Sequence, residues 1–338
     1  MSYKTGADTV IVHGVGGTFG TADTISAGDK LIVDSLSANK NPEELQETGI
    51  GSGAVMASDA QQGATTPTIN VTGTGYFNDA KLQALAVFFQ GESVTGNSSG
   101  YSHSFMHSTF NQKYLTTAWQ YAANSVAEAA SCAVTRFQRT FDNPPNYTKT
   151  SYDLLANDIK YTGTTNSYAT IDAATVASTK KIIIRPTDIV VLNGATVSVT
   201  SVDLNLTKEQ TSPREIKNSA GNGAPIPSGD PPFQGTVTVT LKSLDDHTYF
   251  SGALADSTYT LTITTTGDAI SGSANYTEKW YFPALKLIQE PTYDLSSGGV
   301  NPLTLTFKCI YASSIPSGHF SLYPHCMVIN DRSTTYLS

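Results

Sequence analysis

The sequence predicts a mainly β protein with one short helix in each half. Apolar residues make up 39% of the 338 residues and charged residues only 14%, with 17 Tyr and 13 Phe. Much of the remainder is Thr, Ser, Asn and Gly. β-Branched and aromatic side chains suit a pleated, half-buried surface, so this composition favours strands and turns over helices. The length exceeds the usual span of one hydrophobic core, which indicates two domains.

Strand signals recur along the whole chain. In each of them apolar residues occupy alternate positions, so that one face of the strand is apolar. They cover residues 68–76, 132–141, 195–206, 235–241, 257–266 and 302–311. Two stretches favour helices, DAKLQALAVFF at 79–89 and the weaker YFSGALAD at 249–256. Each follows an Asn-Asp or Asp-Asp start that suits an N-cap.

The two halves of the sequence repeat the same features in the same order. Pro42-Glu43-Glu44-Leu45 aligns with Pro213-Arg214-Glu215-Ile216, and a strand, an acidic cap and a helix follow each copy. The only two tryptophans, Trp119 and Trp280, extend the match and are expected on equivalent strands. We infer a tandem duplication of one α+β module whose order is strand, long loop, strand, helix and three strands.

The repeat sets the expected domain boundaries. They are an N-terminal arm at 1–30, a first module at 31–165, a second module at 166–312 and a C-terminal extension at 313–338 that ends in a polar tail. A Thr/Ser-rich connector at 160–181 joins the halves. Residues 122–131 are expected to form an insertion in the first half only.

Charge and targeting signals exclude several classes of protein. The net charge of -8 argues against a protein that grips nucleic acid by neutralising phosphates. No run of 18 apolar residues is present, and the N-terminus lacks a basic start followed by a long apolar core. We therefore expect a soluble chain that is not exported. The three cysteines, Cys132, Cys309 and Cys326, fit reduced thiols better than a disulfide framework.

Motifs that could carry chemistry are weak. The glycines in VIVHGVGGTFG (10–20) follow a strand but precede no amphipathic helix that could hold a dinucleotide, so a flexible arm is expected there. His103 and His107 lie four apart on a strand pattern, roughly 13 Å distant and too far for one metal. His319, His325 and Cys326 could form a nucleophile and base, but nothing in the sequence brings them together. We expect no enzyme activity, cofactor or metal.

Two long loops remain as candidate functional segments, at 37–66 and 207–234. Connections of this length in a compact domain are usually functional or disordered. Both begin with a charged, proline-marked turn, and both occur at the same place in the repeat. This recurrence favours a docking role over a mobile surface excursion.

The repeat of strand, long charged loop with Pro-x-Glu-Leu/Ile, strand, helix and further strands resembles the duplicated tail tube proteins of long-tailed bacteriophages. The resemblance covers about residues 30–312. It implies β-sandwich or barrel modules, each with one short helix and a long stacking loop. It also implies a ring of six modules, hence three copies of a two-module chain, stacked into the tube of a virion tail and made in the bacterial host cytoplasm.

The resemblance also implies the contact residues and the partners. Contacts between subunits or rings are expected at Pro42, Glu43, Glu44, Leu45, Glu47, Pro213, Arg214, Glu215 and Ile216. The partners are further copies of the chain, a tape measure protein and a distal tail protein, while DNA passes through the lumen without specific binding and no membrane is involved. An acidic lumen would repel DNA phosphates. The alternatives are another tail or capsid structural protein, such as a terminator or decoration protein, and a secreted β-rich binding module or adhesin.

Overall fold

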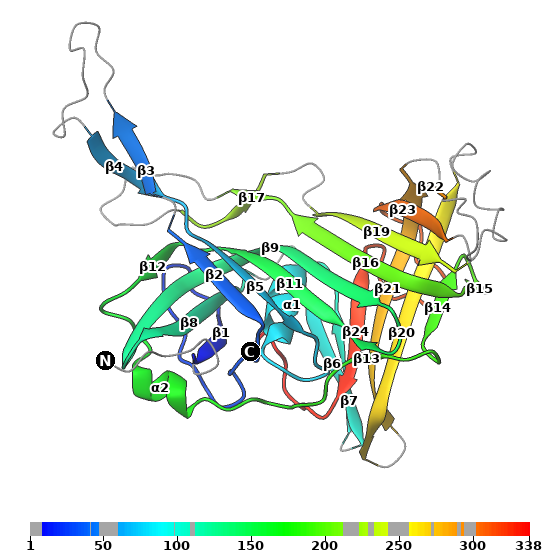
Figure 1. Ribbon diagram of the computed structural model, residues 1–338, viewed down its shortest axis with the longest axis horizontal. Helices are drawn as coiled ribbons and strands as arrows, with labels where there is room; N and C mark the ends of the chain where they lie inside the picture. The colour runs from blue at the N-terminus through cyan, green and yellow to red at the C-terminus, as the bar shows by residue number, and fades with distance from the viewer. Residues whose placement is uncertain are drawn as a thin grey trace, which may run out of the picture.

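The computed structural model describes residues 9–40, 42–46, 60–97, 99–108, 112–211, 223–228, 233–242, 257–271, 274–288, 292–293 and 302–338. Strands account for 57% and helices for 6% of it, which confirms a mainly β protein. Most strands belong to one large antiparallel sheet (Figure 1). The helix expected at 249–256 lies outside the described residues.

Strands of the first half run from β1 to β12. Their bounds are β1 Ile11–Gly16, β2 Ser35–Asn39, β3 Pro42–Gln46, β4 Ala60–Thr65, β5 Thr68–Thr74, β6 Glu92–Asn97, β7 Gly100–Phe105, β8 Tyr114–Ala122, β9 Ser125–Asp142, β10 Asn146–Tyr147, β11 Lys149–Leu155 and β12 Asp158–Lys160.

Strands of the second half run from β13 to β24. Their bounds are β13 Ile183–Ile184, β14 Ile189–Leu192, β15 Ala195–Thr196, β16 Val199–Lys208, β17 Gln210–Thr211, β18 Ile226–Pro227, β19 Phe233–Leu241, β20 Thr258–Ser271, β21 Ala274–Leu287, β22 Thr292–Tyr293, β23 Leu303–Cys309 and β24 His325–Asn330. All six strand stretches predicted from the sequence lie on these elements.

Helix α1, Lys81–Phe89, confirms the helix predicted at 79–89, and all nine of its residues are buried. Its N-cap position is Ala80, which has no capping side chain, but Asp79 Oδ1 accepts from the Lys81 backbone N–H at 3.1 Å. The buried Lys81 ammonium donates to the Ile32 carbonyl at 2.6 Å and pairs with Asp79. A second helix, α2 Tyr168–Ala173, lies in the connector, where Ser167 caps it by accepting from Thr170 N–H.

One apolar core extends through both halves. Phe88 and Phe89 of α1 contact Phe233 on β19, and Phe89 also contacts Trp280 on β21. Strands β9 and β16 pair across the expected boundary at 165/166. The two halves therefore share both their core and their main sheet.

Two terminal segments differ from the expected free arms. Residues 11–16 form β1, which is buried and pairs with β8. Ile11 and Val15 lie opposite Trp119 and Leu115, and all four side chains belong to the core. At the other end β24 inserts between β7 and β21. Tyr336 is fully buried, so 329–338 is not a polar tail on the surface.

The strand pairings follow the same order in both halves. In the first half the order is β1–β8–β9–β11–β5–β2. In the second it is β14–β20–β21–β23–β19–β16. Trp119 on β8 and Trp280 on β21 occupy different places in this order, contrary to expectation. Residues 122–131 form the turn and first part of the β8–β9 hairpin rather than an insertion, since β20 and β21 form a hairpin at the same place.

Candidate functional site: the polar face and open edge of the main sheet

Seven successive pairings join eight strands of the main sheet, and these strands share a polar face. Strands β2, β5, β11, β9, β16, β19 and β23 follow one another, with β21 at the far side. Residues that alternate with the core along these strands are hydroxyl, amide or charged side chains, as in Thr236, Thr238 and Thr240 of β19. One side of the sheet is therefore apolar core and the other is a continuous polar surface.

The two halves meet on this polar face at the junction of β9 and β16. Arg136 Nε donates to Asn205 Oδ1 at 2.8 Å, and Thr140 Oγ1 donates to Asp203 Oδ1 at 2.8 Å. Gln138 Nε2 also donates to Asp203, at 3.1 Å. Thr140 lies directly opposite Asp203, and the other two bonds join diagonal neighbours. Side-chain bonds between such cross-strand neighbours stabilise antiparallel pairing. This junction shows how one half of the chain can be joined edge to edge to the other.

Charges of both signs lie on the polar face. Arg136, Lys149 and Lys308 lie on β9, β11 and β23, while Asp153 and Asp203 lie on β11 and β16. Asp153 accepts from Asn70 Nδ2 at 2.6 Å and lies 3.6 Å from Arg136. The net charge of -8 is therefore not concentrated on this face of the described sheet. An acidic surface facing a channel stays a prediction.

An open edge borders the sheet at β2. Within the described residues β2 pairs with β5 alone, and its other edge has no strand beside it. Ser35 Oγ lies 2.7 Å from Thr72 Oγ1, and Leu36 packs on the core. Unpaired backbone groups on such an edge can template pairing with another chain.

The predicted loop residues fall on a projecting two-stranded arm and beyond it. Pro42, Glu43, Glu44 and Leu45 lie on β3, which pairs with β4. Figure 1 shows this hairpin extending away from the body of the molecule, past the end of β2. The other predicted residues, Glu47, Pro213, Arg214, Glu215 and Ile216, lie outside the described residues. The contacts expected between the loops at 37–66 and 207–234 and neighbouring subunits therefore stay a prediction.

A cavity of about 720 Å³ opens where the strands end beside the roots of the two loops. It is lined by β2, β5, β9, β11 and β16 together with Glu209, Gln210 and Ser228. Sequence reasoning missed it, because its lining comes from five strands that only tertiary pairing brings together. The sequence indicates the cavity only through Lys208, a charged residue at a position where the alternating pattern of β16 predicts a buried apolar side chain.

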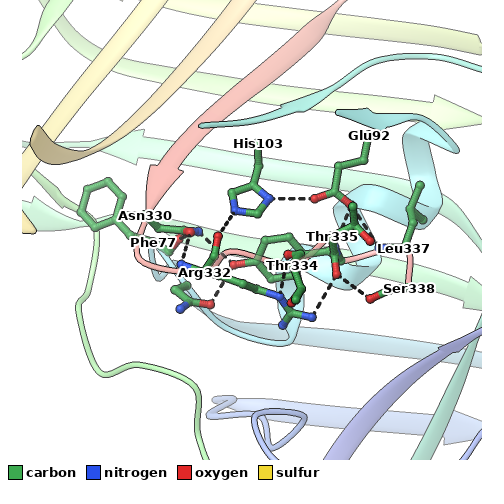
Figure 2. Close-up of polar contacts among 11 residues, drawn as sticks. Phe77, Glu92, His103, Asn330, Arg332, Thr334, Thr335, Leu337 and Ser338 are labelled. Atoms are coloured by element: carbon green, nitrogen blue, oxygen red, sulfur yellow. Dashed lines mark hydrogen bonds and ion pairs between the residues drawn. The ribbon is translucent and has the colours of Figure 1, made fainter. Parts of the chain in front are cut away.

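Sequence reasoning also missed a buried polar cluster at the C-terminus (Figure 2). The Glu92 carboxylate accepts from the backbone N–H groups of Tyr336 at 2.7 Å and Leu337 at 3.0 Å. It also contacts His103 Nδ1 at 2.8 Å, and His103 Nε2 lies 2.8 Å from the Arg332 carbonyl. His103, which drew attention as a possible metal ligand, therefore holds the end of the chain in place.

The remaining histidines and cysteines lie in packed surroundings. His325 stacks on Tyr281 with ring centroids 4.7 Å apart, and burial lowers the pKa of His325 to about 4. His319 lies edge-on to His325 at 5.6 Å. Cys326 is buried in the core, and its burial raises the pKa of the thiol well above its usual value. In the described part of the chain no group of three or more His, Cys, Asp or Glu residues could hold a metal ion.

Comparisons with known proteins add no relative. No protein-family model matches the chain, and no curated protein matches it. Among the described residues no helix is long and apolar enough to cross a membrane.

Proposed function

We propose that this chain is a structural protein of a virion tail that assembles into stacked rings and forms the tail tube through which the genome leaves. The observation that carries the proposal is the repeated pairing order of the two halves, joined edge to edge at β9 and β16. A duplicated module that already pairs with its own copy is suited to pairing with further copies. Three chains would then supply six modules to one ring.

The open edge at β2 supports this arrangement. Strand β16 holds in the second half the place that β2 holds in the first, and β16 is covered by β9. The edge of β2 would be covered in the same way by the equivalent of β9 from a neighbouring chain. That equivalent is the end of β21. The pairing with β20 starts at Lys286, and in the described part of the chain no strand pairs with Leu287 and Ile288 on that side. Closing a ring in this way pairs the exposed edge of β2 in every chain.

Rows of paired residues predict the register between chains. Leu36, Val71, Tyr152 and Phe137 lie in one row of the first half. Leu204, Val237, Phe307 and Leu287 lie in the matching row of the second half. In these rows Phe137 is equivalent to Leu287, and Leu36 is equivalent to Leu204. The next residues along the chain, Gln138 and Asn205, lie opposite each other between β9 and β16. The equivalent pair between two chains is Ile288 of one chain with Ser37 of the next. Ile288 is 50% exposed in the single chain, as an unfilled contact would be.

The polar face would line the channel. Hydroxyl and amide side chains with charges of both signs offer no concentrated positive surface on which phosphates would be held. The projecting β3–β4 arm would reach toward another ring, which is the docking role predicted for the loop at 37–66.

Electron microscopy and cross-linking test the proposal together. Purified protein should form rings or tubes with a central channel, and a particle of three chains should be its repeating unit. The double variant Ser37→Cys with Ile288→Cys should form disulfides between chains on assembly, because opposed strand positions suit disulfide geometry. Ser37→Cys with the equally exposed Tyr147→Cys is the control and should not cross-link. A chain that remains a monomer in all assembly conditions would rule the proposal out.

A further inference from the structure

We draw no further inference here: the strongest candidate, the apolar surface patch that Tyr311, Ile315 and Leu322 form on the loop between β23 and β24, is exposed in the single chain, but nothing in the structure shows what covers it.

Discussion

At the scale of single residues, the ion pair between Arg139 and Glu278 joins the two halves inside the core. Arg139 Nε donates to Glu278 Oε1 at 3.2 Å, and Nη2 donates to the same carboxylate. The side chains are 3% and 0% exposed. Arg139 Nη1 also donates to Thr150, and a Cβ at Gly75 would collide with the guanidinium group. The pair therefore holds β9 and β21 at a defined position.

Removing one partner of this pair should destabilise the chain strongly. Glu278→Gln leaves the Arg139 charge buried and uncompensated, so the free energy of unfolding should fall by about 3–5 kcal/mol. Urea unfolding measures this loss. Asp268→Asn removes an exposed carboxylate that pairs with Lys180 and Arg185, so it is the control and should cost much less. A loss in Glu278→Gln no larger than in the control would contradict the role of the pair.

Buried histidines should make the fold sensitive to acid. Burial lowers the pKa of His13 to about 3, with a smaller lowering by the Lys81 charge, and the ring contacts Tyr152 Oη at 2.6 Å and Thr117 Oγ1 at 3.0 Å. A folded-state pKa below the unfolded value near 6.5 means that the unfolded chain binds protons more tightly. The resulting stability is present above about pH 6.5 and is lost as the pH falls toward 3.

The pH dependence gives a measurable slope. Between pH 7 and pH 5 His13 alone should cost about 2 kcal/mol of unfolding free energy, and His107 and His325, whose pKa values are lowered to about 4, should add to it. Urea unfolding across this range should show the loss. His13→Gln, which keeps a hydrogen-bonding side chain, should flatten the slope. An unchanged slope in this variant would show that His13 does not contribute.

At the scale of elements, β24 and the residues after it fasten the second half to the first. β24 pairs with β21 on one side and with β7 on the other. The Tyr336 hydroxyl donates to Asn78 Oδ1 at 2.8 Å. The Tyr336 backbone N–H donates to the Glu92 carboxylate, which lies in the cluster of Figure 2. The C-terminal segment is therefore a structural clamp, and its removal should affect the β6–β7 hairpin first.

Deleting residues 331–338 tests this clamp. The deletion leaves Glu92 and His103 without their backbone partners and removes the buried ring of Tyr336, so a loss of about 3–5 kcal/mol is expected. Hydrogen exchange should accelerate in β6 and β7 before it does in β5 or β11. Deletion of Ser338 alone is the control and should leave exchange unchanged. Uniform acceleration over the whole sheet would indicate global destabilisation instead of a local clamp.

At the scale of the whole molecule, the pairing order of the strands is the feature that favours assembly of several chains into a ring. Each half contributes four strands in succession to the main sheet, and one edge of the series, at β2, is left open. A single chain with such an edge would be prone to uncontrolled pairing, whereas a closed ring is not. The projecting arms at the rim then provide contacts along the axis of the proposed tube.

Substitutions in the loops separate folding from stacking. Leu45→Asp together with Ile216→Asp should leave folding intact but should impair contact between rings, because both positions lie in the two loops to which the docking role is assigned. Tube length measured by electron microscopy should fall, while circular dichroism and Tm should match the wild type. Glu43→Gln, which keeps the size of the side chain, serves as a milder comparison. Tubes of normal length in the double variant would remove the docking role of the loops.

Local pattern alone determined the strands and helix α1. Alternation of apolar and polar residues is a property of neighbouring positions, so β5, β16, β19 and β23 could be predicted. The repeat was visible for the same reason. The stretch from Pro42 was predicted as a turn in a long loop, whereas the structure has the paired strands β3 and β4 there. Segments with mixed patterns, such as 11–16 and 325–330, have the local sequence of terminal arms, because their burial depends on strands far away in sequence.

Tertiary structure alone decided which strands lie side by side. Pairing energy depends on backbone groups that every strand offers, so the sequence does not reveal that β9 pairs with β16 or that β2 remains open. The same holds for Lys208, the last residue of β16. Only the fold placed this lysine in a cavity, because the lining comes from five strands brought together by long-range pairing.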